Sequence, residues 1–303
     1  MMGKEDLKIS EEDLKRVGLP KAKKPEEEDP RAKETQDLNA VLSEIKHKLI
    51  VCSGKGGVGK STVSVNLAMT LAAQGKSVGI LDIDITGPNI PKMLHIEDAR
   101  PEVEPGQNRF YPVNGPLNVK IMSMAFLLET PDTPVIWRGP LKMSALRQFI
   151  KDGYWGKLDY LVIDLPPGTG DETLDIMQLV DGHVIVVTTP QDVATLDAGK
   201  TITMSRTMKR PILGVIENMS GFTVKCPHCN KEETYNLFGN GGGENMATSM
   251  KTPFLGKIPI ELSVREQGDS GIPIVIKNPE SASAHAFEAI VKNIRDQLEP
   301  LKK

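Results

Sequence analysis

The sequence predicts an α/β fold: a doubly wound, mainly parallel sheet in a single domain. Short, continuous apolar runs alternate with helix-length segments along most of the 303 residues. Continuous apolar runs are typical of parallel strands, which are buried on both faces because helices cover the two sides of the sheet. A glycine-rich segment directly follows the first of these runs and opens a helical pattern. Doubly wound sheets bind their ligands at such strand ends.

The expected elements follow one another in chain order. A short helix is predicted for residues 36–48, because apolar residues recur there at helical intervals. A longer helix is predicted for residues 59–74, within and after the glycine-rich segment. The last helix, residues 281–298, has a modest apolar stripe and mixed charge. Buried strands are predicted at residues 47–52, 78–81, 119–122, 160–163, 183–188, 212–216 and 254–257.

Three segments fall outside this alternation. Residues 1–34 alternate charged blocks with prolines, which predicts a disordered charged tail in front of a domain formed by residues 35–303. Between about residues 90 and 116 the pattern fades into Pro, Glu and Gly. A second irregular stretch covers about residues 220–243. Both stretches are predicted to be insertions near functional edges of the domain.

Composition narrows the function classes. A formal net charge of −3 argues against a broad cationic face, so no nucleic-acid partner is expected. No stretch offers the ~20 uninterrupted apolar residues that span a bilayer, so no membrane partner is expected. The charged amino end does not resemble a secretory signal, which predicts a cytoplasmic protein. Three cysteines are too few for a disulfide framework.

The clearest motif is SGKGGVGKST at residues 53–62, which has the Walker A pattern of phosphate-binding loops. Glycines let consecutive backbone N–H groups turn toward phosphate oxygens, and the following helix N-terminus adds positive partial charge. Lys60 is expected to neutralise the terminal phosphates and Ser61 to hold Mg²⁺. The predicted ATP contacts are Gly54, Lys55, Gly56, Gly57, Val58, Gly59, Lys60, Ser61 and Thr62.

An additional lysine, Lys55, lies early in this loop. With both lysines, the KGGVGK segment resembles the deviant Walker A ATPases, which include MinD, ParA and the nitrogenase iron protein. The resemblance implies that Lys55 reaches across a homodimer to the partner's nucleotide, so that hydrolysis depends on assembly. Lys55 would then act like an arginine finger supplied in trans, offsetting charge in the transition state. A solvated loop charge is the alternative interpretation.

Polar residues follow three of the predicted strands. Asp82 and Asp84 end one strand, and resemblance to the switch I segment implies that Asp84 positions the attacking water while Asp82 lies nearer the metal. Paired aspartates at a strand end can instead form a turn. Asp164 follows four apolar residues in the Walker B arrangement and is expected to bind Mg²⁺. Asn218 falls where the deviant Walker A class recognises the adenine base through a side-chain amide. The alternative interpretation is that Asn218 forms a turn at the end of the strand.

Cys226 and Cys229 form a CPHC segment, and their spacing lets both sulfurs bind one metal centre. Two ligands do not complete a zinc or 4Fe-4S site, and the third cysteine, Cys52, lies in the first predicted strand. Two copies meeting on a two-fold axis would supply four sulfurs for one bridged 4Fe-4S cluster. The alternatives are a redox pair, half of a zinc ribbon with His228, or a structural thiol pair.

The full set of motifs resembles the Mrp/ApbC family of iron-sulfur cluster carrier ATPases over roughly residues 45–298. The resemblance implies ATP hydrolysis coupled to a 4Fe-4S cluster that a homodimer shares and delivers to apo iron-sulfur proteins. Some members carry an amino-terminal cysteine cluster or a small acidic domain that this sequence lacks, which implies one cluster site per dimer. Besides the Walker A loop, the segments that carry the resemblance are DIDITGPNIP, IWRGP at 136–140, LPPGTGDE, ENMSGF and CPHC.

Two rival functions share these motifs. A positioning ATPase of the MinD or ParA kind would need a carboxyl-terminal amphipathic membrane helix or a basic surface. The mixed charge of residues 281–298 favours the carrier over that switch. A reductase resembling the nitrogenase iron protein would share the bridged cluster but would need redox cycling with a partner enzyme.

Overall fold

A computed structural model describes Leu38 and residues 40–85, 87–104, 106, 109–128 and 139–300. Its central sheet consists of β1 (Ile45–Ser53), β2 (Val78–Asp82), β5 (Val113–Asn114), β6 (Lys120–Ser123), β7 (Leu158–Asp164), β8 (His183–Thr188), β9 (Ile212–Glu217) and β12 (Phe254–Lys257). The spatial order is β12-β9-β8-β1-β7-β2-β6-β5. Every neighbouring pair is parallel except β5 with β6.

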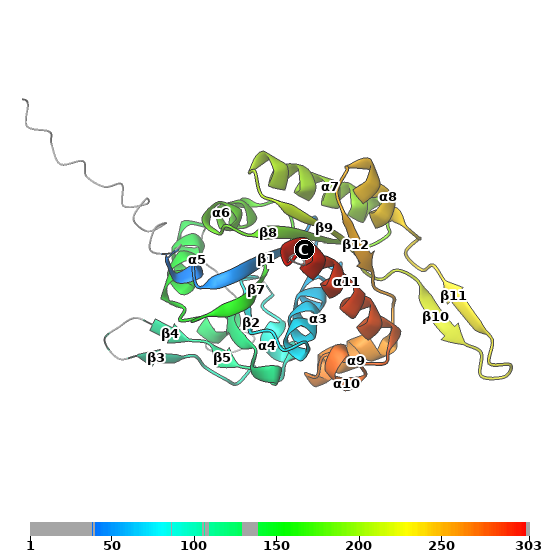
Figure 1. Cartoon of the computed structure of the whole chain (residues 1–303), viewed down its shortest axis with the longest axis horizontal. Helices are drawn as coiled ribbons and strands as arrows, with labels where there is room; N and C mark the ends of the chain where they lie inside the picture. Colours follow the sequence, from blue (N-terminus) through cyan, green and yellow to red (C-terminus); the bar gives the residue numbers. More distant parts are fainter. Residues whose placement is uncertain are drawn as a thin grey trace, which may run out of the picture. The chain divides into compact units, whose positions relative to one another are not determined.

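Helices cover both faces of this sheet, as Figure 1 shows. One face packs against α3 (Lys60–Ala73), α4 (Ile90–Met93), α9 (Leu262–Ser270), α10 (Ile274–Lys277) and α11 (Ala282–Leu298). The other face packs against α5 (Gly139–Asp152), α6 (Asp171–Leu179), α7 (Asp192–Thr207) and α8 (Gly242–Ser249). Two short 3₁₀ turns, η1 (Pro116–Asn118) and η2 (Met124–Leu127), flank β6. The predicted doubly wound fold is confirmed.

Alternate residues of the central strand β1 enter two separate hydrophobic cores. Leu49 and Val51 pack into the core that contains α3 and α11, whereas Ile50 and Cys52 pack into the core beneath α5 to α8. All four side chains are fully buried. This two-sided burial explains why the strands appear in the sequence as continuous apolar runs.

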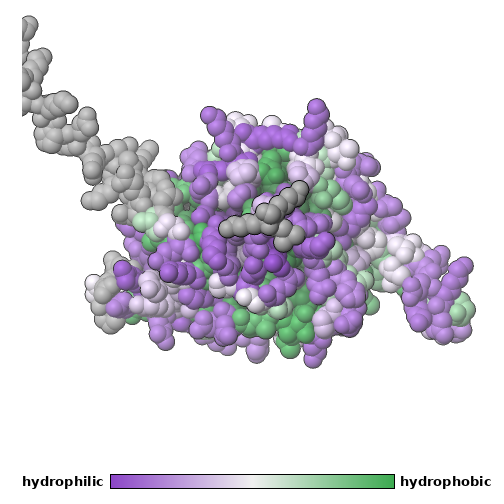
Figure 2. Space-filling view, in the orientation of Figure 1, coloured by the Kyte–Doolittle hydropathy of each residue, from purple (hydrophilic) through white to green (hydrophobic). Residues whose placement is uncertain are grey.

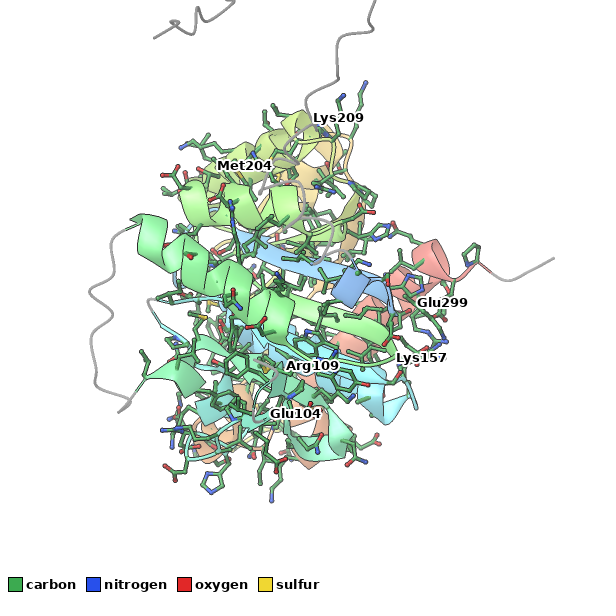
Figure 3. All side chains as sticks on the ribbon, turned by 90° about the vertical axis from the view of Figure 1, so that its left-hand side faces the viewer. Glu104, Arg109, Lys157, Met204, Lys209 and Glu299 are labelled. Atoms are coloured by element: carbon green, nitrogen blue, oxygen red, sulfur yellow. The ribbon has the colours of Figure 1, made fainter. Side chains whose placement is uncertain are left out.

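Two small hairpins form two-stranded sheets of their own. β3 (Glu102–Glu104) pairs with β4 (Arg109–Tyr111) inside the stretch predicted to be irregular, and Figure 3 shows Glu104 and Arg109 on this hairpin. β10 (Phe222–Lys225) pairs with β11 (Glu232–Tyr235) inside the cysteine-bearing stretch. This second hairpin extends away from the sheet in Figure 1, and its surface is largely hydrophilic in Figure 2.

The helix predicted for residues 36–48 was extended too far toward its carboxyl end. Helical backbone is present at Leu38 and residues 40–42, but β1 already begins at Ile45. Ile45 pairs with Leu158 in the parallel ladder, so sheet pairing overrides the helical spacing of the apolar residues. The tail predicted for residues 1–34 lies outside the described residues. None of the helices described is long and apolar enough to cross a membrane.

Candidate functional site

The glycine-rich loop turns sharply between β1 and α3. Gly57 and Gly59 have φ angles of 81° and 80°, a left-handed conformation that favours glycine. A side chain on Gly59 would also collide with its surroundings, because a Cβ there would lie 2.3 Å from Asn218 Nδ2. The loop therefore requires glycine for both its backbone conformation and its close packing.

Lys60 and two serines of α3 converge on one fully buried carboxylate, Asp164, at the end of β7. Lys60 Nζ lies 2.7 Å from Asp164 Oδ2, and Ser61 Oγ donates to the same oxygen at 2.6 Å. Ser64 Oγ donates to Asp164 Oδ1, also at 2.6 Å. The predicted Walker A and Walker B residues are thus in direct contact.

A second buried carboxylate lies beside the first. Asp82 is the register partner of Asp164 on the adjacent parallel strand, and it is likewise fully buried. Ser123 Oγ donates to Asp82 Oδ2 at 2.8 Å. Burial, followed by the neighbouring charge of Asp164, raises the pKa of Asp82 to about 8. Two adjacent buried carboxylates are a suitable site for a divalent cation, which would stabilise both charges.

Asp84 and Lys55 face the phosphate side of the site. Both residues line a cleft of about 320 Å³ together with Lys60 and residues 56–59. Asp84 is buried and accepts a hydrogen bond from the Gly87 N–H at 3.2 Å. Within the described part of the chain, the Lys55 ammonium forms no ion pair, whereas Ser53 Oγ donates to the Lys55 carbonyl at 3.0 Å.

A second cavity, of about 480 Å³, continues from the phosphate cleft. The two share Gly59, Thr62, Asn89 and Met93 in their walls. Asn218 lines the second cavity and donates from Nδ2 to the Val58 carbonyl at 2.9 Å. The structure therefore places Asn218 next to the loop, and its contact with a nucleotide base stays a prediction.

The cysteine pair lies in the turn of the β10–β11 hairpin. Cys226 is partly exposed and Cys229 is exposed. The Cys226 N–H donates to the Lys231 carbonyl, and the Asn230 N–H donates to the Cys226 carbonyl, both at 2.9 Å. Hydrogen bonds from the backbone N–H groups of Cys229 and His228 lower the pKa of the Cys226 thiol. Such N–H donors stabilise a thiolate, the form that binds metals.

The third cysteine belongs to a different environment. Cys52 is fully buried in β1 and donates from Sγ to the Ile185 carbonyl at 3.5 Å. Burial raises the pKa of its thiol to about 12. In the described ranges, no group of three or more His, Cys, Asp or Glu side chains could hold a metal ion. The exposed pair therefore has no further protein ligand within the described part of one chain.

A family model described as the ParA-type NUBPL iron-transfer P-loop NTPase matches residues 44–295. The chain belongs to this NTPase family. The match includes the phosphate-binding loop, both carboxylates and the cysteine hairpin. As a member of the iron-transfer NTPase family, the chain is an ATPase, and the predicted family resemblance is confirmed.

Curated relatives support the same family. A protein from Methanocaldococcus jannaschii named iron-sulfur cluster carrier protein is 48% identical over 274 residues, covering 89% of this chain and 91% of the relative. A protein of the same name from Synechocystis is 45% identical and covers 89% of this chain and 76% of the relative. At this level of identity, both belong with the chain in one family of iron-sulfur cluster carrier ATPases.

Solved structures agree with the fold of the NTPase family. A nucleotide-binding protein from Archaeoglobus fulgidus, determined in complex with ADP, is 37% identical with a TM-score of 0.70. The match covers 84% of this chain and 96% of that protein. The cell division ATPase MinD from Pyrococcus furiosus is 24% identical with a TM-score of 0.62, covering 83% of this chain and 99% of MinD. That second likeness concerns the fold alone.

Sequence reasoning missed two hydroxyl groups in the site of this NTPase. Ser64 follows Lys60 by one helical turn, so the period of α3 could have placed it on the same face. Ser123 reaches Asp82 from the end of a neighbouring strand. Strand ends of a parallel sheet share one edge, but the sequence does not indicate that β6 is the neighbour of β2.

Proposed function

We propose that this chain hydrolyses Mg²⁺-ATP and carries a 4Fe-4S cluster that two copies share, delivering the cluster to apo iron-sulfur proteins. The observation that carries the proposal is the accessible pair Cys226 and Cys229 at the turn of a hairpin that extends from an ATPase domain. The names of the curated relatives support it. The proposed location is the cytoplasm, where thiols stay reduced.

On the nucleotide side, the roles follow from charge and position. Ser61, Asp82 and Asp164 would hold Mg²⁺, because hydroxyl and carboxylate oxygens are the ligands that this ion prefers. Bound Mg²⁺ would neutralise phosphate charge. Lys60 neutralises the terminal phosphates from the same cleft. Asp84 orients the attacking water, and Lys55 acts on the nucleotide of the partner copy.

On the cluster side, one chain provides half of a site. A cubane cluster takes four thiolates, whereas the hairpin of one chain offers two. A two-fold axis brings identical surfaces together, so two hairpin turns facing one another would complete the set. Hydrolysis would move the switch loops and change the separation of the two cysteine pairs, which alters how tightly the cluster is held.

The first test is anaerobic reconstitution of a Cys226→Ser/Cys229→Ser variant with iron and sulfide. We expect the wild-type protein to take up about four iron atoms per dimer and show cluster absorbance. The double variant should lose both signals and retain ATP binding, because the P-loop is separate from the hairpin. Cys52→Ala is the matched control and should retain the cluster, since Cys52 is buried in the sheet.

Two outcomes would reject the cluster site: a cluster that persists in the double variant, or wild-type protein that binds zinc and takes up no iron. Delivery is tested by incubating reconstituted protein with an apo 4Fe-4S enzyme and following recovery of that enzyme's activity. A protein that stores the cluster without releasing it would leave the enzyme inactive.

A further inference from the structure

The two flanks of the cysteine hairpin meet at one buried carboxylate. Glu217 ends β9 and is fully buried. Its Oε1 accepts a hydrogen bond from Ser220 Oγ, just before β10, at 2.6 Å. Its Oε2 accepts a hydrogen bond from the Gly243 N–H, at the start of α8, also at 2.6 Å. The residue next to Glu217 is Asn218, so the base of the hairpin is fixed directly beside the nucleotide cavity.

A side chain from the hairpin segment also enters that cavity. Phe238 lies three residues after the end of β11, between the cysteine hairpin and the α8 helix. It lines the 480 Å³ cavity together with residues of α9, including Val264, and it is 36% exposed. Among the residues that line this cavity, Phe238 is the one that belongs to the cysteine-bearing stretch 220–243.

The position and chemistry of the cavity indicate its occupant. It shares Gly59 and Thr62 with the phosphate cleft, so a nucleotide whose phosphates lie in the P-loop extends its nucleoside into it. The lining is largely apolar, with Met219, Ile258 and Phe238 among its residues. Aromatic rings stack on nucleobases, and such contacts contribute about 1–3 kcal/mol per base.

We propose that Phe238 contacts the base of bound ATP and thereby makes the position of the cysteine hairpin depend on nucleotide binding. Glu217 holds both flanks in place, while β10 and β11 pair along their whole length. A shift of Phe238 is therefore passed along β11 to the turn that carries Cys229. The consequence for the cluster rests on the proposed function, whereas the contact with ATP does not.

The contact is tested by binding measurements on Phe238→Ala. We expect the Kd for ATP to rise about tenfold, the effect of losing one stacked base. The Kd for tripolyphosphate, which has no base, should stay unchanged. Phe238→Tyr should bind ATP like the wild type because it keeps the ring. Leu237→Ala is the matched control, since Leu237 is 61% exposed and does not line the cavity.

Two binding results would overturn the contact. ATP affinity of Phe238→Ala within twofold of the wild type would show that the ring does not meet the base. An equal loss of ATP and tripolyphosphate affinity would show that the substitution damages the P-loop and removes no base contact.

The linkage is tested by the rate at which iodoacetamide alkylates Cys226 and Cys229 in the cluster-free protein. We expect ATP to change this rate in the wild type and in Leu237→Ala. The response should be lost in Phe238→Ala at saturating ATP. An unchanged response in Phe238→Ala, or none in the wild type, would overturn the linkage. Failure of the cluster proposal would be seen separately, as absent iron uptake with the alkylation response intact.

Discussion

At the scale of single residues, the site depends on how one buried charge is neutralised. Asp164 is fully buried and receives hydrogen bonds from Lys60, Ser61 and Ser64. A buried carboxylate is costly unless it is paired and hydrogen-bonded. Lys60 therefore has a structural role toward Asp164 in addition to its expected role toward phosphate.

Lys60→Ala should remove both roles. We expect kcat/KM for ATP to fall at least about a hundredfold, because a positioned positive charge on the phosphates is lost. The free energy of unfolding should also fall by roughly 2 kcal/mol, because Asp164 loses its ion pair. ATPase assays and denaturant titrations measure the two effects.

The control for this prediction is Lys46→Ala. Lys46 also pairs with an aspartate, at 2.6 Å from Asp159, but its side chain is 70% exposed. Its removal should leave ATP turnover and the melting temperature close to those of the wild type. Unchanged turnover in Lys60→Ala would contradict the assignment of the loop.

At the scale of elements, α11 is held in place along its length and at its end. Phe287, Ile290, Val291 and Ile294 form a buried stripe that packs into the core with α3. These side chains are not available to insert into a membrane while the domain is folded. The apolar stripe of α11 is therefore part of the domain's hydrophobic core.

The end of α11 is fixed by Glu299, labelled in Figure 3. Its carboxylate accepts hydrogen bonds from Tyr160 Oη at 2.6 Å and from Lys76 Nζ at 3.0 Å. These contacts, the Tyr160 bond foremost, lower the pKa of Glu299 to about 2. The ionised carboxylate therefore stabilises the fold above the ordinary pKa of 4.5, and this contribution is lost as the pH falls toward 2.

Glu299→Gln should lower the free energy of unfolding by about 1 kcal/mol at pH 7, because it removes the charge that Tyr160 and Lys76 bind. The difference from the wild type should shrink as the pH is lowered below about 4. Denaturant titrations at several pH values measure it. Glu288→Gln, on the exposed side of the same helix, is the control. A pH-independent difference would show that the carboxylate charge is not the cause.

At the scale of the whole molecule, both proposed chemistries are incomplete in one chain. The hairpin supplies two of the sulfurs that a cluster takes, and the role proposed for Lys55 lies on the nucleotide of another copy. The proposed homodimer, with the P-loop faces toward one another, would have to meet both requirements.

Mixing two inactive variants tests this assembly. Lys55→Ala and Lys60→Ala should each hydrolyse little ATP alone. In a mixed dimer, the Lys55→Ala subunit keeps its own Lys60 and receives Lys55 from its partner. One of the two nucleotide sites in that dimer is therefore complete. An equal mixture should recover about a quarter of wild-type activity, because half of the dimers are mixed. No recovery, or an active Lys55→Ala protein, would contradict a lysine supplied in trans.

Much of the molecule could be predicted from the sequence because its signals are local. The strands following the P-loop, the loop itself and the CPHC turn are each encoded within about ten neighbouring residues. The prediction of a helix over residues 36–48 was wrong at its carboxyl end, because the structure there depends on a non-local contact. The strand pairing of Ile45 with Leu158 joins distant parts of the chain, and helical spacing cannot reveal it.

By itself, the sequence determined the doubly wound class, the phosphate-binding loop, the two carboxylates at strand ends and the closely spaced cysteine pair. Only the tertiary structure decided that Asp82 lies beside Asp164, that Glu217 joins the two flanks of the hairpin, and that Phe238 lines the cavity next to the phosphate-binding loop. The physical reason is the order of strands in the sheet. Strand order brings together side chains that are far apart in the chain, and no local pattern records which strands are neighbours.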